Sequence, residues 1–339
     1  MANNVNEKST VTPVLYFSEL YNLSDIGVNV FYEGQTSFKY LCETSFVVNL
    51  FEKIKMLMRD KFDEFNFYVY SYGWKQDVLP NSVFHEYEKR KILIYISDES
   101  GNVPYYLAPY FYCIFKIHLQ LDKFIVNNIF NFPLGCEKYV PKQTYKSIYE
   151  RKYSVFFSGN LNYGRLPLFF YLIIGKIPAK IIIKGIKVFM RIRIFKKILT
   201  LFRFDSKFPN AFIRFTNGFK QGLSPEKYGE IISNSKIVLC PKGFNLPECF
   251  RHYEAMRAGC VIISEKLPPT FFYKGSPIIQ ISDWKEGLKI ADELLNNNSK
   301  LEELSKMTIN WWENKCSENA TAQYIIECIE SIENKKNGT

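Results

Sequence analysis

The stretch "CPKGFNLPECFRHYEAMRAGC", from Cys240 to Cys260, decides how this chain is built. It holds a glycine loop followed by a charged segment with helical spacing, and apolar runs flank it at residues 237–239 and 261–263. This order predicts a buried strand, a loop, a helix and a second buried strand. Such a unit is typical of a parallel sheet covered by helices. The loop, Lys242 to Phe244, then lies beyond the carboxyl end of a strand, where α/β proteins bind ligands.

Arg251 and Glu254 stand three residues apart in the predicted helix and therefore share one face. A guanidinium can hold a phosphate with two donors, and a carboxylate can accept from the two vicinal hydroxyls of a ribose. The helix start supplies free N–H groups, and Gly243 lets the backbone approach a ligand closely. The segment predicts a clamp for a nucleoside diphosphate. The simpler alternative is a solvated ion pair on a surface helix.

Strand and helix patterns alternate along the rest of the chain. Apolar, β-rich runs predict strands at residues 14–20, 65–73, 152–160, 210–218, 237–240, 261–264 and 277–281. Residues 89–100 predict a buried strand between a basic lead and an acidic turn, and residues 127–136 predict a short strand followed by a loop. Helical spacing and capping residues predict helices at residues 46–62, 106–119, 224–235 and 283–295, and a last amphipathic helix that carries Trp311, Trp312 and Tyr324. Ser224 is one expected helix cap, and Ser282 or Asp283 is another. The alternation predicts the α/β class.

The patterns also divide the chain. We expect a disordered tail at residues 1–12, one Rossmann-like domain at 13–145, a second at 146–300, and a final helix at 301–339 that packs back toward the first domain. The largely polar segment 133–151 is the expected linker. Two such domains that face a central cleft direct the carboxyl ends of their strands at one ligand.

Residues 235–271 resemble the donor-binding segment of exostosin-like glycosyltransferases, which have the two-domain GT-B fold. Members of that family carry a strand, a Pro-x-Gly-type loop, an R-x-x-E-A helix, a Gly-Cys pair and a later proline. The matching residues here are Pro241, Lys242, Gly243, Arg251, Glu254, Ala255, Gly259, Cys260 and Pro268. Weaker similarity covers residues 155–165 and 128–136, which are similar to the strand that opens the family's second domain and to the strand that closes its first.

The resemblance implies a transferase that moves a sugar from a nucleotide-sugar donor to a glycan or lipid-linked acceptor in the synthesis of a bacterial surface polysaccharide. It places the donor in the second domain and the acceptor on the first. By the resemblance, Glu254 binds the ribose and Arg251 the diphosphate. The remaining donor-site residues implied, or expected from the loop's position, are Gly159, Arg165, Lys242, Gly243 and Phe244. Transferases of this fold usually need no bound metal, so no cofactor is expected.

An inverting transferase also needs a general base, which should come from the first domain. Asp98 and Glu99 follow a buried strand directly and are the candidates, and Glu19 and Asp25 are rivals. Asp98 could instead be a turn-forming acid before a glycine. Of the three histidines, His118 lies in an apolar run and is expected to be a packed residue, and His252 is expected at the surface.

The charge of the chain predicts an anionic partner. Its net charge is +10, and no acidic residue occurs between residues 161 and 204. Residues 176–203 carry Lys or Arg at helical spacing among aliphatic side chains, which is typical of a segment that binds an anionic membrane surface, although ordinary α/β elements with a basic surface are the alternative. We expect a cytoplasmic protein, peripheral on the inner face of the membrane, because the first residues lack the apolar core of a signal peptide.

Two other classes of protein are weighed against the enzyme. A non-catalytic relative would bind a nucleotide-sugar or a glycan without transferring it. A nucleic-acid-binding protein is suggested by charge alone and is not expected, because the basic residues are interleaved with aliphatic rather than aromatic side chains. The eight cysteines form no C-x-x-C pair, which predicts free thiols rather than a zinc site or disulfides.

Overall fold

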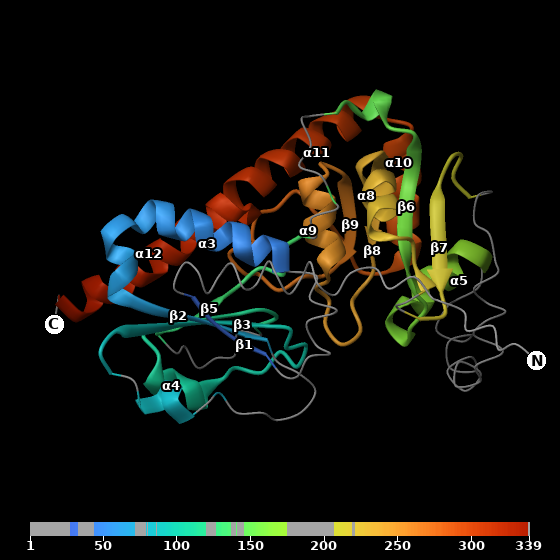
Figure 1. Ribbon diagram of the computed structural model, residues 1–339. Helices are drawn as coiled ribbons and strands as arrows, with labels where there is room; N and C mark the ends of the chain where they lie inside the picture. The colour runs from blue at the N-terminus through green and yellow to red at the C-terminus, as the bar shows by residue number, and fades with distance from the viewer. Residues whose placement is uncertain are drawn as a thin grey trace, which may run out of the picture.

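The computed structural model contains two five-stranded parallel sheets joined by long C-terminal helices (Figure 1). It describes residues 28–32, 44–71, 79, 81–85, 87–119, 127–136, 140, 146–174, 207–218 and 221–337. The predicted tail, the strand predicted at residues 14–20, the rival acids Glu19 and Asp25, and the basic segment 176–203 lie outside the described residues.

The first sheet follows the chain in order, β1-β2-β3-β4-β5. Its strands are β1 Val28–Tyr32, β2 Phe65–Ser71, β3 Arg90–Ile96, β4 Cys113–Lys116 and β5 Ile129–Asn131. Helix α3, Thr44–Met58, packs on one face, while α4, Asn81–His85, and a 3-10 turn at Tyr105–Tyr110 cover the other. The helix predicted at residues 106–119 is wrong, because only a short turn surrounds Pro109 and the apolar run after it pairs with β3 as a buried strand.

The second sheet has the order β10-β9-β8-β6-β7. Its strands are β6 Tyr153–Asn160, β7 Phe212–Thr216, β8 Ser235–Cys240, β9 Val261–Glu265 and β10 Ile279–Ile281. β6 pairs with β7 on one side and with β8 on the other, so the strand order reverses between β6 and β8. Ligands of open α/β sheets bind in the crevice that forms at such a reversal, beyond the carboxyl ends of the strands.

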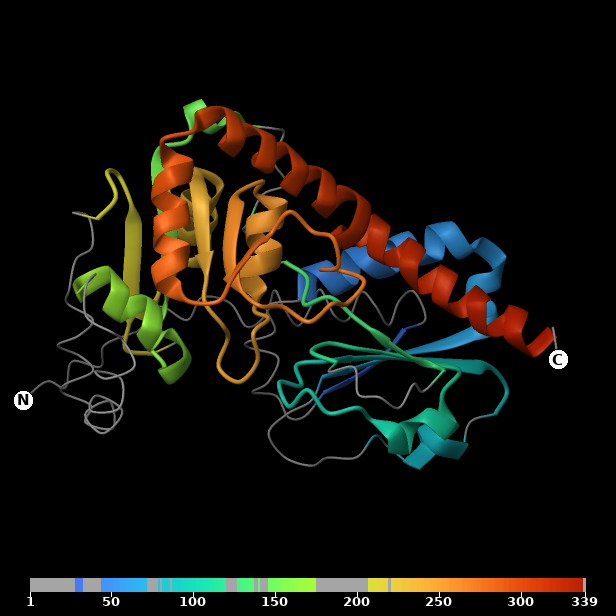
Figure 2. The ribbon, with the colours of Figure 1, turned by 180° about the vertical axis from the view of Figure 1, so that it is seen from behind.

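Helices cover both faces of the second sheet (Figure 2). One face carries α8, Pro225–Ser233, and α9, Phe250–Arg257, and the other carries α5, Leu166–Ile174, and α10, Trp284–Leu295. The caps predicted for two of these helices are confirmed. Ser224 accepts from the N–H of Lys227, and Asp283, rather than Ser282, accepts from two N–H groups at the start of α10.

The C-terminal helices connect the two sheets. α11, Asn298–Trp311, is followed by a π-helical turn at Trp312–Cys316 and by α12, Glu318–Asn337. A single last helix is therefore wrong, because Ser317 has an extended backbone that separates α11 from α12. α12 runs diagonally across the molecule and packs against α3 (Figures 1 and 2). Buried side chains of both helices belong to the same apolar cluster, which also includes side chains of α9.

Helix α9 begins later than its sequence suggests. Pro247 suits the first turn of a helix and predicts a start at residues 246–248, but Cys249 has an extended backbone and the first helical residue is Phe250. At its other end, Gly259 has φ +65° and stops the helix in the left-handed conformation typical of a glycine cap. The carbonyl of Gly259 accepts a hydrogen bond from Oγ of Ser305 at 2.6 Å, so α11 rests directly on this cap.

Replacing Gly259 with alanine should destabilise the protein. The added Cβ would lie 2.4 Å from Cγ1 of Ile309, and side chains disfavour the left-handed backbone. We expect a loss of more than about 2 kcal/mol in the free energy of unfolding. Denaturant unfolding measures it as a lower midpoint at constant slope. Gly218→Ala is the matched control, because a Cβ there meets nothing within 4 Å; equal midpoints for the two variants would contradict this account of the cap.

Candidate functional site

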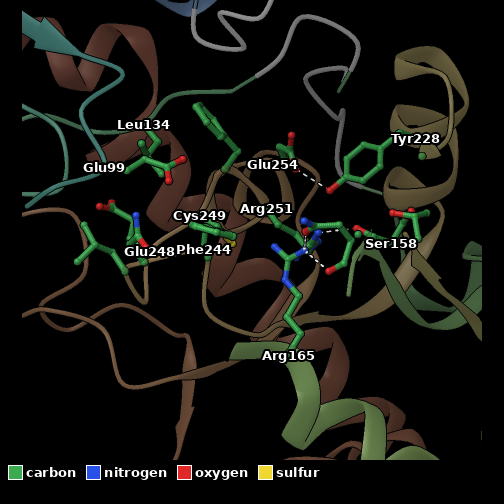
Figure 3. Close-up of a pocket in the computed structure, with 18 of the residues that line it drawn as sticks. Glu99, Leu134, Ser158, Arg165, Tyr228, Phe244, Glu248, Cys249, Arg251 and Glu254 are labelled. Atoms are coloured by element: carbon green, nitrogen blue, oxygen red, sulfur yellow. Dashed lines mark hydrogen bonds between the residues drawn. The ribbon is translucent and has the colours of Figure 1, made fainter. Parts of the chain in front are cut away.

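A pocket of about 440 Å³ lies where the carboxyl ends of the two sheets face each other (Figure 3). The first sheet contributes Glu99, which follows β3, and His118, which follows β4. The second contributes the end of β6, the loop after β8 and the start of α9. The reversal of strand order between β6 and β8 therefore forms one wall of the pocket.

Arg165 and Arg251 form a pair of buried cations in that wall. Nη1 of Arg165 donates to the carbonyl oxygen of Asn160 at 2.8 Å, and Nη2 of Arg251 donates to the carbonyl oxygen of Ser158. Both side chains are less than 8% exposed, and neither makes an ion pair with a carboxylate within the described ranges. Nε of Arg165 and both Nε and Nη1 of Arg251 lack hydrogen-bond partners there. Buried N–H groups of this kind are costly unless a ligand accepts from them.

Gly159 explains how the two guanidinium groups can approach each other. A Cβ at this position would lie 2.8 Å from Nη1 of Arg165 and 2.9 Å from Nη2 of Arg251. Burial and the neighbouring charge of Arg251 lower the pKa of Arg165 to about 10, which still leaves it charged at neutral pH. Burial would also lower the pKa of Arg251, but the acidic groups around it, led by Tyr228 and Cys249, raise it instead.

Glu254 lies one helical turn beyond Arg251, as the sequence predicted for residues on one face. Its Oε2 accepts from the hydroxyl of Tyr228, on α8, at 2.6 Å. Burial and the carboxylate of Glu254 raise the pKa of Tyr228, so the hydroxyl remains a donor. Glu254, Tyr228 and Arg251 all line the pocket, and Figure 3 shows them on the same side as Arg165.

The other predicted donor-site residues divide into two groups. Gly159, Gly243 and Phe244 line the pocket, and Phe244 is more than half exposed. The backbone N–H of Gly243 donates to the carbonyl of Leu246 at 2.8 Å and closes the loop. Lys242 does not line the pocket, since its side chain lies over Gly164, where a Cβ would be 2.6 Å from its Cε.

Asp98 and Glu99, the predicted catalytic acids, differ in their surroundings. Asp98 is buried and pairs with Lys116 at 3.0 Å, and its Oδ1 accepts from the N–H of Ser100. It does not line the pocket, whereas the exposed Glu99 does. Burial lowers the pKa of Lys116, and the charge of Asp98 opposes that change. The two side chains form a buried ion pair outside the pocket lining.

His118 is a packed residue, as expected, with a side chain that is only 7% exposed, whereas His252 lies elsewhere than expected. His118 lines the pocket and stands 3.0 Å, through Nδ1, from Oε2 of Glu248. His252 is fully buried rather than at the surface, because its Nε2 is 2.7 Å from Oγ of Ser264 on β9. Nδ1 of His252 is 3.3 Å from Sγ of Cys249, which caps α9 and lines the pocket. The sequence pattern did not single out Glu248 and Cys249, although both stand in the stretch 240–260 that decides the fold.

Cys249, which lines the pocket, has a thiol with a lowered pKa. Burial would raise its pKa, but His252, Arg251 and Arg165 lower it to about 6. Burial raises the pKa of Cys240 and of Cys260 nearby. The seven described cysteines are all free, as predicted, and no group of three His, Cys, Asp or Glu among the described side chains could hold a metal ion.

Iodoacetamide should label Cys249 already in weakly acidic solution, because the thiolate is the nucleophile and forms above a pKa of about 6. We expect the labelling rate, followed by mass spectrometry of the peptide, to reach half its maximum near that pH. Cys240 and Cys260, which are fully buried, are the internal controls. A midpoint near 8.5, the value of an ordinary thiol, would show that the neighbouring cations do not act on Cys249.

Comparisons with known proteins match part of the second half of the chain to a protein family and most of the chain to solved structures. Residues 216–331, about a third of the sequence, match the family model described as the RXYLT1 C-terminal domain. No curated protein matches. Among solved structures, TarM is similar with 14% identity and a TM-score of 0.43, over 84% of this chain but only 58% of TarM. AviGT4, a glycosyltransferase involved in avilamycin A biosynthesis, is similar with 11% identity and a TM-score of 0.44, over 86% of this chain and 90% of AviGT4.

A third similar structure is HepE of Anabaena in complex with UDP, with 10% identity and a TM-score of 0.45 over 94% of this chain and 82% of HepE. The family match confirms the resemblance to exostosin-like glycosyltransferases that the sequence predicted, and two parallel sheets whose carboxyl ends face one pocket are the GT-B fold.

Proposed function

We propose that this protein is a glycosyltransferase that moves a sugar from a nucleotide-sugar donor to a glycan or lipid-linked acceptor. The observation that carries the proposal is the buried pair Arg165 and Arg251, two residues that line a pocket at the reversal of strand order and carry N–H groups without hydrogen-bond partners in the described part of the chain. Two adjacent cations without carboxylate partners favour a ligand with adjacent negative charges, and a diphosphate has that chemistry.

The same pair supplies the electrostatic part of catalysis. When the bond between the sugar and the diphosphate breaks, negative charge collects on the leaving phosphate. Fixed cations in a site of low polarity stabilise that charge without having to reorganise. Gly159 leaves room for a phosphate to reach both guanidinium groups, because any side chain there would occupy the space in front of them.

Glu254 is placed to hold the ribose of the donor. Tyr228 fixes one of its carboxylate oxygens and the side chain lines the pocket one turn beyond Arg251. A nucleotide whose diphosphate rests on the arginines then brings its ribose hydroxyls to this carboxylate. The expectation that no metal is needed stays a prediction, and turnover that persists in excess EDTA would support it.

The biological role that we propose is the assembly of a bacterial surface polysaccharide such as O-antigen, capsule or lipopolysaccharide, at the cytoplasmic face of the membrane. The basic segment 176–203 supports this role by its composition alone. No helix among the described residues is both long and apolar enough to cross a bilayer. A relative that binds nucleotide-sugars without transferring them is the alternative function.

A donor screen tests the proposal. UDP-, GDP-, CMP- and TDP-sugars are added to the protein, and the melting temperature and the release of free nucleotide are measured. We expect one nucleotide class to raise the melting temperature by mass action and to be consumed. Binding without consumption would favour the non-catalytic alternative, and no shift with any of the four at millimolar concentration would refute the proposed donor site.

Glu254→Gln should weaken donor binding at least about tenfold, because hydrogen bonds to a charged acceptor each contribute about 1.5–3 kcal/mol. Glutamine keeps the volume of the side chain and an oxygen for Tyr228, so the fold is preserved. A 2′-deoxyribose donor should bind wild type weakly and lose less on mutation. Calorimetric titration measures all four affinities, with the exposed Glu230→Gln on α8 as control. Equal affinities for wild type and Glu254→Gln would leave Glu254 a structural carboxylate.

Replacing Lys180, Lys184, Lys187 and Arg191 by glutamine should weaken binding to anionic vesicles, because each basic residue near an anionic leaflet contributes about 1 kcal/mol. Donor affinity should be unchanged. Vesicle sedimentation at low salt, with neutral vesicles as control, measures the effect. If the wild-type protein does not sediment with anionic vesicles, the proposed membrane binding is refuted.

A further inference from the structure

The pocket has a second chemical centre, opposite the arginine pair. Figure 3 shows Glu99, Leu134 and Glu248 on one side and Arg165, Arg251 and Tyr228 on the other. His118 lines the pocket from the first sheet and pairs with Glu248, which the second half of the chain supplies. An imidazole paired with a carboxylate across from a cationic site is the arrangement in which one nitrogen is oriented and the other reacts.

Glu248 is held in a way that fixes the imidazole. Its Oε1 accepts from the hydroxyls of Tyr253 and Tyr273, both at 2.8 Å, and its Oε2 is left for Nδ1 of His118. Burial would raise the pKa of Glu248, but His118 and the two tyrosines lower it, so the carboxylate stays charged. Nδ1 lies 3.0 Å from this oxygen, although the pair does not have the geometry of a hydrogen bond. A nearby carboxylate favours a proton on the nitrogen that faces it, which leaves Nε2 as the acceptor.

The backbone of His118 is also unusual. It has φ +53°, in the left-handed region that few side chains adopt, two residues after the end of β4. Such conformations cost free energy and persist where the surrounding structure imposes them, often at functional sites. Asp98 is not an equivalent candidate, because its carboxylate is committed to Lys116 and lies outside the pocket lining.

We propose that His118 is the catalytic base of the transfer, and that Glu248 is its positioning residue; this rests on the proposed glycosyltransferase function. Nε2 of His118 takes the proton of the acceptor hydroxyl while that oxygen forms a bond to the anomeric carbon. The bond from this carbon to the phosphate oxygen breaks, and its electron pair leaves with the nucleoside diphosphate held by Arg165 and Arg251. A single displacement of this kind inverts the anomeric configuration, so the product has the configuration opposite to that of the donor.

Two substitutions distinguish the role of His118 as the base from the role of Glu248 in orienting its imidazole. His118→Asn tolerates the left-handed backbone and keeps a donor near Glu248, but it has no atom at the position of Nε2. Glu248→Gln keeps an oxygen for the two tyrosines and turns an NH₂ group toward His118. That group donates to Nδ1, so the imidazole proton moves to Nε2 and the base is lost. His85, exposed on α4, gives the matched control His85→Gln.

The first test is nuclear magnetic resonance of the free protein with ¹⁵N-labelled histidine. The chain has only three histidines, so His118→Asn and His85→Gln assign the signals by difference. We expect the proton of neutral His118 on Nδ1 in wild type and on Nε2 in Glu248→Gln. A proton on Nε2 in wild type would overturn the proposal whether or not the protein transfers sugar.

The second test is the hydrolysis of the nucleotide-sugar selected by the donor screen, with water as the acceptor. His118→Asn and Glu248→Gln should each lower kcat at least about 100-fold, as loss of a general base does, and change KM and calorimetric donor affinity less than threefold. The acid limb of the wild-type pH profile should disappear in His118→Asn. The charged groups of the described residues that lie on the same side of the pocket as His118 are Glu248, Glu99 and the Lys116–Asp98 pair, so Glu99→Gln is measured as well.

The outcomes distinguish the two proposals. If wild type binds no donor, the donor site itself is refuted, and if it binds a donor without hydrolysing it, the non-catalytic alternative is favoured. Binding with an unchanged kcat in His118→Asn, a loss confined to Glu99→Gln, or a product that retains the donor configuration would each overturn the assignment of His118.

Discussion

Two like charges buried side by side are the constraint around which this pocket is arranged. Arg165 and Arg251 come from different elements and meet at Gly159, and backbone carbonyls at the end of β6 hold one nitrogen of each. The ring of Phe157 lies beneath both guanidinium groups, 5.8 Å from one and 4.8 Å from the other. These contacts orient the charges without neutralising them, so the site has a lower free energy when an anion is bound.

Glu248 joins the two halves of the chain chemically. Its carboxylate accepts from two tyrosines of the second half and pairs with a histidine of the first, so one buried acid fixes both the loop before α9 and the end of β4. In the proposed reaction, the second half supplies the cations for the leaving group and the first supplies His118 for the acceptor. A pocket that contains both sets of side chains exists only when the two sheets are docked.

The sequence predicted best what depends on neighbours in the chain. Short-range spacing predicted three features that are present: the strands around α9, the capping of α8 and α10, and the common face of Arg251 and Glu254. His118 and Glu248 meet across the fold, and nothing local marks either one. The apolar run before His118 is the sequence feature from which the position of this residue could have been predicted. As a strand rather than a helix, it places His118 beyond a carboxyl end. The late start of α9 has a similar cause, since Glu248 is held outside the helix by groups far away in sequence.

The packing of α12 against α3 determines when, during synthesis, the core of the first half can be completed. The ribosome makes α3 early and α12 only after the whole second sheet, yet buried side chains of both belong to one apolar cluster. A nascent chain that has already formed the first sheet must leave the side of α3 that contacts α12 uncovered until the C-terminal helices emerge. N-terminal domains commonly fold during synthesis, but here the first half completes its core last. Chaperones that recognise exposed apolar surface therefore have a long interval in which to bind this chain.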